Sequence, residues 1–530
     1  MKAVTNPILP GFNPDPCILR HGDDYYIATS TFEWFPGICL YHSRNLIDWE
    51  IIGHALDRPS QLDLRGIQSS EGVWAPDLTF CEKEGLFYLT YTVMRNWGYD
   101  GPRDMHNFLV TSPSIEGPWS DPIFLDSGGI DPSFCFDEDG KTYYLRNCWD
   151  YRAGKDHFAG IVMQEYDRTK KTLVGESRLI FAGSGLGKVE GPHLYHLNGW
   201  YYLMTAEGGT FYDHAVTMAR SHSPWGPYEV DPDNPMLSSR FFPNNALQKA
   251  GHASLMQTKE GLWYIAHLCA RPLPSRGRCI LGREAALQKV IWTDDGWLKL
   301  TEGGSEPRLV VEVPELESGK PSNAALLTDD FDDTKLSPIY QSLRFKLDEK
   351  RCNLTERPGF LRLRGKESVT SRFEQSLVAR RQTSFCYDAA TALECSPKDY
   401  NQLAGLIAFY DHRHFFYLAK TRIDDTEVLN LYCCNKGSWI EPIKPVPVPA
   451  GSRVYLKASM RYDHLQFSYS LNEQDWQELG PSFDSSILSD EYLEPMHFTG
   501  AFIALCAQDL AGREFVADFD YFSYEDPEHV

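Results

Sequence analysis

Short runs of aromatic and aliphatic residues, each bounded by Gly, Pro, Asn or Asp, follow one another along the whole chain. No long stretch repeats with the period of about 3.6 residues that marks an amphipathic helix. Short runs rich in Tyr, Ile, Leu, Phe and Val between turn residues are typical of β-strands. The pattern therefore predicts an all-β protein.

A repeat runs through the first half of the chain. An acid or a histidine beside Pro or Gly is followed by a short aromatic strand such as Thr142-Tyr-Tyr-Leu or Trp200-Tyr-Tyr-Leu. The polar residue of the five repeats is Asp15, Asp77, Asp131, Glu190 and His252. A period of about sixty residues, with each unit built of strands, predicts a five-bladed β-propeller whose equivalent positions meet at one axis.

The repeat ends near residue 305, where a polar stretch containing Pro and Gly begins. Beyond it, apolar and polar residues alternate, as in the segments 360–364 and 498–502, and the segments 454–462 and 465–471 predict a hairpin. We expect a propeller over residues 1–305, a linker over 306–323 and a β-sandwich of concanavalin-like or jelly-roll type over 324–530.

Charge and composition narrow the choice of partner. The 530 residues carry a formal net charge of −22, spread along the chain, which disfavours nucleic acid and anionic membranes. No apolar run approaches the roughly twenty residues of a membrane span, and no secretory signal is apparent at the N-terminus. The 13 cysteines lack the spacing of a zinc site and are expected to be free thiols, so we expect a cytoplasmic protein.

Three repeat acids, Asp15, Asp131 and Glu190, suit the hydrolysis of a glycosidic bond. One carboxylic acid must protonate the leaving oxygen, and one carboxylate must attack or activate water. A third carboxylate nearby raises the pKa of the acid. Taken singly, each could be a solvated turn residue, but the shared register favours catalysis. The aromatic content of 13% is consistent with sugar binding, although a sheet core would also explain it.

Several motifs strongly resemble glycoside hydrolase family 43, and specifically its two-domain β-xylosidases. They are Asn6-Pro-Ile-Leu-Pro-Gly-Phe-Asn-Pro-Asp15-Pro, Ser30-Thr-Phe-Glu-Trp-Phe-Pro36-Gly, Trp74-Ala-Pro-Asp77, Asp131-Pro-Ser-Phe, Glu190-Gly-Pro-His193 and Leu281-Gly-Arg283-Glu. The resemblance extends to the C-terminal segments Phe498-Thr-Gly-Ala-Phe502 and Ala517-Asp-Phe-Asp-Tyr521. It implies a five-bladed propeller with a β-sandwich and hydrolysis with inversion at the anomeric carbon.

The resemblance also implies roles for individual residues. Asp15 matches the general base, Glu190 the general acid, and Asp131 the carboxylate that keeps the acid protonated and in place. Arg283 matches an arginine that contacts sugar hydroxyls and the acids, and its planar charged group suits that task. The residues that match the walls of the terminal-sugar pocket are Phe32, Trp74 and one of Phe498 and Phe502.

The resemblance implies that His252 lies below the site and holds a water or a metal ion, whereas a hydrogen-bonded core histidine is the plainer interpretation. One imidazole alone does not make a metal site. Four acids near the ends of the sandwich could bind Ca²⁺ or simply be solvated: Asp330, Asp332, Asp518 and Asp520. We expect no required cofactor, with calcium in the channel or the sandwich left open.

We expect an exo-acting β-xylosidase that cleaves β-1,4-xylo-oligosaccharides from the non-reducing end. An α-L-arabinofuranosidase, alone or as a second activity, is the enzymatic alternative, because both sugars present similar hydroxyl patterns. A non-catalytic sugar-binding propeller is the alternative of another class, but it would have lost one of the three acids, and none is lost. The sequence leaves a homo-oligomer open.

Overall fold

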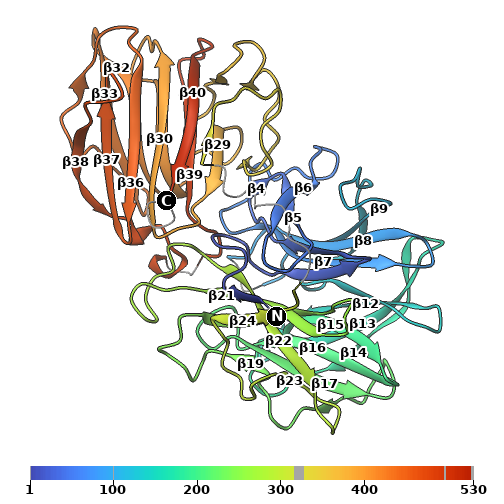
Figure 1. Cartoon of the computed structure of the whole chain (residues 1–530). Coiled ribbons are helices and arrows are strands. Elements are labelled where there is room, and N and C mark those ends of the chain that lie inside the picture. The colour runs from blue at the N-terminus through green and yellow to red at the C-terminus, as the bar shows by residue number, and fades with distance from the viewer. Residues whose placement is uncertain (1, 99–100, 316–326, 494–496, 527–530) are drawn as a thin grey trace.

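The computed structural model describes residues 2–98, 101–315, 327–493 and 497–526. Two units built of strands are stacked on one another, with the N-terminal unit below the C-terminal one in Figure 1. Within the described residues the helical turns are the 3₁₀ turns η2 (Ser485–Ile487) and η3 (Asp490–Tyr492). None of the described helices is long and apolar enough to cross a membrane. The all-β prediction is confirmed.

The N-terminal unit is the predicted five-bladed propeller, and each blade is an antiparallel sheet. Blades one and two contain β2 (Cys17–His21), β3 (Asp24–Thr29), β5 (Gly37–Ser43) and β6 (Glu50–Leu56), then β7 (Gly72–Cys81), β8 (Leu86–Met94), β9 (Met105–Ser112) and β10 (Ile123–Asp126). Blade three contains β11 (Ser133–Phe136), β12 (Thr142–Trp149), β13 (Phe158–Asp167) and β14 (Thr172–Phe181). Blades four and five contain β15 (Glu190–Leu197), β16 (Trp200–Glu207), β17 (Ala215–Ser221), β18 (Glu229–Val230) and β19 (Leu237–Ser238), then β20 (Gln248–Gln257), β21 (Trp263–Ala270), β22 (Glu284–Trp292) and β23 (Leu298–Leu300).

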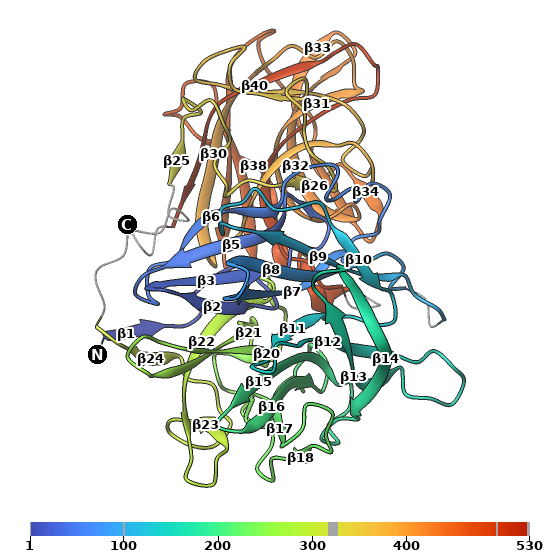
Figure 2. The same cartoon turned by 90° about the vertical axis from the view of Figure 1, so that its right-hand side faces the viewer.

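The blades pack through separate apolar clusters rather than one continuous core. Ile38 and Leu89, for example, belong to a buried cluster shared by blades one and two, and Tyr202 and Ile265 to one shared by blades four and five. Figure 2 shows the blades fanned out below the second unit. Because the first strand of every blade lies innermost, the residues that precede these strands converge near one axis.

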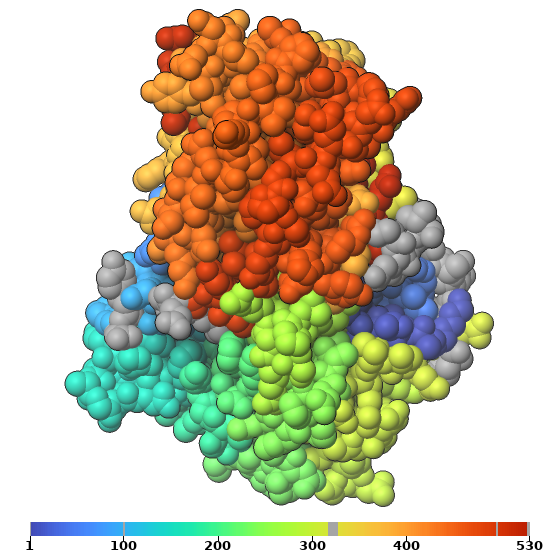
Figure 3. Space-filling view, turned by 90° about the vertical axis from the view of Figure 1, so that its left-hand side faces the viewer, coloured from blue at the N-terminus to red at the C-terminus, as the bar shows by residue number. Residues whose placement is uncertain are grey.

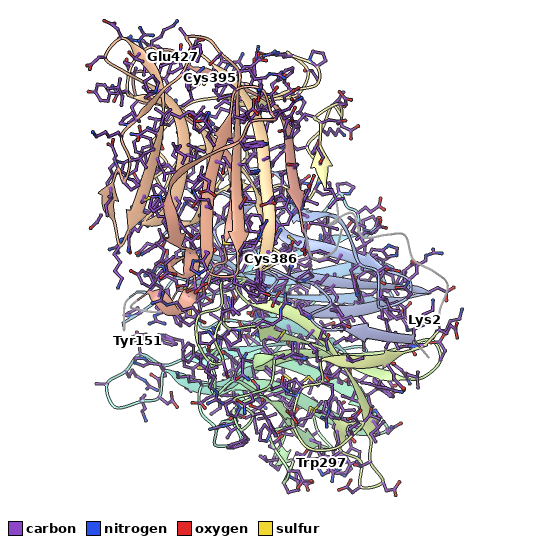
Figure 4. All side chains as sticks on the ribbon, turned by 60° about the vertical axis from the view of Figure 1, so that its left-hand side comes forward. Lys2, Tyr151, Trp297, Cys386, Cys395 and Glu427 are labelled. Carbon is purple, nitrogen blue, oxygen red and sulfur yellow. The ribbon has the colours of Figure 1, made fainter. Side chains whose placement is uncertain are left out.

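The N-terminal segment closes the ring against the last blade. Strand β1 (Lys2–Thr5), marked by Lys2 in Figure 4, pairs antiparallel with β24 (Val310–Val313). The amide of Asn6 donates a hydrogen bond of 2.8 Å to the Leu287 carbonyl of β22. The stretch predicted as a linker from residue 306 therefore includes the strand β24, which pairs with β1. The rest of that linker, from residue 316, lies outside the described residues.

The C-terminal unit is the predicted β-sandwich of two antiparallel sheets. One sheet contains β25 (Thr328–Asp329), β27 (Cys352–Asn353), β28 (Leu361–Arg364), β40 (Val516–Glu525), β30 (Cys386–Cys395), β36 (Val454–Arg461), β37 (His464–Ser470) and β38 (Gln477–Asp484). The other contains β29 (Ser376–Arg381), β39 (Phe502–Asp509), β31 (Gln402–Asp411), β32 (His414–Ile423), β33 (Thr426–Asn435), β34 (Ser438–Ile440) and β35 (Val446–Pro447). The predicted hairpin is confirmed, because β36 and β37 pair directly. Figure 4 shows β30 running from Cys386 beside the propeller to Cys395 at the far end.

The two units share a continuous interface, and Figure 3 shows the orange and red sandwich packed closely on the propeller. Strand β4 (Trp34–Phe35) of the first unit pairs with β26 (Ser342–Leu343) of the second. The Trp34 ring stacks on the Phe502 ring with centroids 3.8 Å apart. This packing places the segment before β39 against the propeller, where it can wall a site.

Candidate active site

The three predicted acids occupy the same place in their blades, at or just before the innermost strand. Asp15 lies two residues before β2, Asp131 two residues before β11, and Glu190 begins β15. Asp15 and Asp131 adopt left-handed backbone conformations, with φ of 54° and 59°. Such conformations are strained for residues other than glycine and occur often at functional sites. The structure brings all three acids into one pocket.

The pocket lies where the propeller meets the sandwich. Its cavity of about 160 Å³ is smaller than the roughly 300–1,000 Å³ of sites for drug-sized ligands, and it suits a single sugar ring. The lining combines acids and bases with aromatic rings: Asp15, Phe32, Trp74, Ala75, Trp97, Ile130, Asp131, Phe158, Lys188, Glu190, Gly209, Thr210, Phe211, His252, Arg283 and Phe498.

Asp15 is held by three polar neighbours. The hydroxyl of Ser30 donates a hydrogen bond of 2.7 Å to its Oδ2. Nη1 of Arg283 lies 3.4 Å from Oδ1, and Nδ1 of His252 lies 3.6 Å from the same oxygen. Arg283 thus places a positive charge beside this carboxylate oxygen. Asp15 is thus placed to act as a base.

Asp131 and Glu190 form a carboxyl pair in which protonation is favoured. Burial, and then the negative charge of Asp15, raise the pKa of Asp131 to about 7. Burial raises the pKa of Glu190 well above its usual value, and the charges of Asp131 and Asp15 add to this effect. The backbone N–H of Gly191 donates to Asp131 Oδ2 at 2.9 Å, so the peptide that follows Glu190 is tied to Asp131. Glu190 is therefore placed to act as an acid at neutral pH.

Arg283 links the acids to the sandwich. Its Nη2 donates a hydrogen bond of 2.9 Å to the carbonyl oxygen of Phe498, and its Nη1 donates one of 3.2 Å to Thr210 Oγ1. The guanidinium carbon lies 5.0 Å from the ring centroid of Phe32 and 5.7 Å from that of Phe498. A buried cation between two aromatic walls is fixed in direction and can also reach sugar hydroxyls.

The aromatic walls come from both units. Phe32 and Trp74 lie with ring centroids 5.4 Å apart, and Trp74 lies 5.9 Å from Phe498. The backbones of Phe32 and Val73 exchange two hydrogen bonds, which fixes the loops of blades one and two side by side. Phe498 is held in turn by Ser70, whose hydroxyl oxygen accepts its backbone N–H at 2.8 Å.

Phe502 does not line the pocket. It lies in the interface core, where it stacks on Trp34 and packs 6.1 Å from Phe12. The alternating pattern predicted a strand over 498–502, but β39 begins only at Phe502. The described residues just before it belong to no strand, so strand alternation does not govern them. Of the two aromatic candidates, the structure places only Phe498 in the site.

His252 lies in the pocket beside Asp15, with a left-handed φ of 45°. Burial lowers its pKa to about 4, so the ring is neutral at pH 7. Within the described residues it belongs to no group of three metal-ligating side chains. A cation at His252 would need water for most of its ligands, so the protein donors present do not by themselves fit a metal site.

The four acids of the sandwich do not gather around a common point either. Asp518 accepts hydrogen bonds from Arg362 at 2.7 and 2.9 Å and from Arg357 at 2.8 Å. Asp520 forms an ion pair of 2.9 Å with Arg453. Asp330 accepts a hydrogen bond from the backbone of Asp332. Two of the four charges are thus offset by arginines, a donor set that does not suit Ca²⁺.

Several lining residues carry no signal in the repeat. Trp97 and Phe211 lie in loops outside the strands, and Thr210 in the same loop as Phe211 binds Arg283. Trp97 extends the aromatic wall, with ring centroids 5.1 Å from Trp74 and 5.7 Å from Phe498. The only hint in the sequence was the aromatic character of these loops, since blade register fixes strand starts and not loop paths.

Comparison with known proteins covers both units. A model described as glycosyl hydrolases family 43 matches residues 4–298, and one described as beta xylosidase C-terminal concanavalin A-like domain matches residues 328–525. A xylosidase/arabinosidase 43B of Humicola insolens is 45% identical over 100% of this chain and 99% of its own. A β-xylosidase of Bacillus subtilis (strain 168) is 43% identical over 99% of each chain. The crystal structure of xylan β-1,4-xylosidase from Bacillus halodurans C-125 superimposes with a TM-score of 0.96 at 46% identity, covering 99% of this chain and 100% of that one.

Proposed function

The chain belongs to glycosyl hydrolase family 43, and we propose that it is an exo-acting β-xylosidase that releases xylose from the non-reducing end of short β-1,4-xylo-oligosaccharides. The observation that carries this proposal is the pocket itself. Three carboxyl groups meet in a cavity sized for one sugar ring, and Phe498 of the sandwich walls it. A site of this size accepts the end of a chain rather than its middle.

The geometry supports a separate role for each acid. Glu190, whose pKa is raised by burial and by the charges of Asp131 and Asp15, donates its proton to the departing glycosidic oxygen. Asp15, which lies beside Arg283, takes a proton from a water that attacks the anomeric carbon on the opposite face. Asp131 keeps the pKa of Glu190 high and anchors the peptide after it. One attack by water inverts the anomeric configuration.

The proposal is tested with xylo-oligosaccharides of two to four sugars labelled at the reducing end. We expect xylose as the first product and a labelled chain one sugar shorter. Proton NMR during the first turnovers should show α-xylose before mutarotation. Release of xylobiose from the labelled tetramer, or β-xylose as the first anomer, would contradict the exo mode or the inversion respectively.

A second activity toward α-L-arabinofuranosides is supported by the name of the Humicola insolens relative, a xylosidase/arabinosidase. The two activities can be compared on nitrophenyl β-xyloside and nitrophenyl α-L-arabinofuranoside. Both substrates would use the same acids, so Asp15→Ala should abolish both activities together. Loss of only one of them in that variant would indicate a separate site.

We propose that the enzyme works in the cytoplasm on oligosaccharides already shortened by other hydrolases. All thirteen cysteines are free thiols, most of them buried, which is typical of proteins of reducing compartments. The catalytic steps above use only side chains of this chain and require no cofactor.

A further inference from the structure

A second cluster of reactive side chains lies at the hub of the propeller. Cys17, Asp77 and His193 offer a sulfur, a carboxylate oxygen and a ring nitrogen that all lie within 4.8 Å of one another. Across the described ranges this is the only group of three such donors. None of the three lines the catalytic pocket, and none has a part in the hydrolysis described above.

The three donors come from different parts of the chain. Cys17 begins β2 in blade one, Asp77 lies within β7 in blade two, and His193 lies within β15 in blade four. The innermost strands of three blades therefore place a soft, a hard and a borderline ligand around one point. Sulfur, carboxylate oxygen and imidazole nitrogen are the donor types that zinc takes in proteins.

Two distances agree with a tetrahedral ion. Zn–S bonds of about 2.3 Å and Zn–N or Zn–O bonds of about 2.0–2.1 Å give tetrahedral edges of about 3.5 Å from sulfur to oxygen and about 3.3 Å from nitrogen to oxygen. Sγ of Cys17 lies 3.6 Å from Oδ1 of Asp77, and Nδ1 of His193 lies 3.3 Å from the same oxygen. Two of the three edges thus match those of a coordination shell, and the third, from the Cys17 sulfur to a ring nitrogen of His193, is at most 4.8 Å. A fourth position would be left for water.

Backbone groups orient two of the donors. The N–H of Phe134 donates to Asp77 Oδ2 at 3.0 Å, which leaves Oδ1 facing the other two side chains. The N–H of Leu78 donates to the Cys17 sulfur at 3.2 Å, a contact that stabilises a thiolate. Cys17 and Asp77 are 3% and 4% exposed, so bulk water does not compete for them.

We propose that Cys17, Asp77 and His193 bind one zinc-type divalent cation. Without the ion, the same atoms can form hydrogen bonds, with the Cys17 thiol donating to Asp77. Binding therefore replaces the S–H bond with an S–metal bond and releases one proton to solvent.

The ion would hold in place the strands that carry the catalytic base and acid. Cys17 follows the base Asp15 by two residues, and His193 follows the acid Glu190 by three. Tying these two strands to β7 would hold the base and the acid at a constant separation. The ion would touch neither substrate nor reacting atoms, so its effect on the reaction is one of positioning.

The test uses the full-length protein, stripped with a chelator and then dialysed against Zn²⁺ or Co²⁺. We expect about one ion per chain by elemental analysis, a higher Tm with zinc, and a thiolate-to-cobalt charge-transfer band in the near ultraviolet. Cys17→Ser should abolish that band. His193→Gln should weaken zinc binding at least about tenfold, because even outer partners of a metal site cost 10–100-fold when lost. Zinc affinity should also fall about tenfold for each unit of pH lost, since one proton is released.

Cys269→Ser is the matched control, because Cys269 is also fully buried in the propeller but lies outside the cluster. It should keep the cobalt band and the full zinc content. The absence of the band in the unmodified protein would overturn the proposal by itself. Zinc content that survives in both cluster variants, or that falls equally in Cys269→Ser, would overturn it as well.

Discussion

Lys249 of the fifth blade and Glu491 of the sandwich form a buried ion pair across the domain interface. Their side chains are 1% and 9% exposed. The backbone N–H of Cys279 also donates to Glu491, at 2.8 Å. Burial alone would raise the pKa of Glu491, but the charge of Lys249 keeps it below the usual value. The ammonium group further lies 5.1 Å from the ring centroid of Phe211, a pocket residue, so the pair joins the interface to the site.

Removing one partner of this pair should therefore lower the free energy of unfolding. We expect Lys249→Met to lower the free energy of unfolding by about 3–5 kcal/mol, because Glu491 is left charged and buried. The double variant Lys249→Met/Glu491→Gln should recover part of that loss. Urea unfolding measures the free energy of unfolding of the single and the double variant. Lys259→Met is the control, since its pair with Asp23 is exposed and should matter little. Equal losses in the two single lysine variants would contradict this account.

Substrates that differ in leaving group separate the acid from the base. In Glu190→Ala the rate on xylobiose should fall by about 10²–10⁴-fold, because the sugar alkoxide cannot depart without a proton. In an aryl xyloside the leaving group is an acidic phenol, which departs without that proton. The rate on such a substrate should therefore fall far less. Asp15→Ala should lose both activities, because every substrate needs an activated water. Steady-state kcat/KM on the two substrates gives the answer. Similar losses on both substrates in Glu190→Ala would refute its assignment as the acid.

Asp131 should set the alkaline limit of activity. The reaction needs Glu190 protonated, so kcat/KM falls as pH rises through the pKa of Glu190. The negative charge of Asp131 raises that pKa, second only to burial. Asp131→Asn removes the charge and keeps an oxygen for the Gly191 N–H, so the alkaline limb should move to lower pH. Burial remains, so the limb should stay above the pKa of an ordinary glutamate. A pH profile with an unmoved limb would show that Asp131 acts only by position.

The repeat in the sequence was enough to predict the propeller and to bring Asp15, Asp131 and Glu190 together. Register fixes where each innermost strand starts, and the acids stand at those starts. It does not fix the loops, so Trp97 and Phe211 could not be placed in the pocket beforehand. The alternation of apolar and polar residues predicted a strand over 498–502, but strand pairing begins only at Phe502. The reason is related, because the path of the chain before a strand is not fixed by the pattern within it. Contacts across the domain interface, rather than local pattern, decide which of the two aromatic rings lines the pocket.

That distinction predicts opposite consequences for two phenylalanines four residues apart. Phe498 walls the pocket and is supported by Trp74 and Trp97, whereas Phe502 fills the core against Trp34. Phe498→Ala should raise KM for xylobiose several-fold with a modest loss of stability, because the ring lines the pocket. Phe502→Ala should lower the free energy of unfolding by about 3–5 kcal/mol, because it leaves a cavity between the domains, and should nearly keep the KM of the folded fraction.

Urea unfolding and steady-state kinetics on the same preparations separate the two effects. Phe415→Ala serves as the control, since Phe415 is equally buried in the sandwich but lies outside the pocket lining. It should match Phe502→Ala in stability loss and leave KM unchanged. If Phe502→Ala raised KM as much as Phe498→Ala did, the ring behind the wall would be shaping the sugar site itself. The division of labour between a wall residue and a core residue would then be wrong.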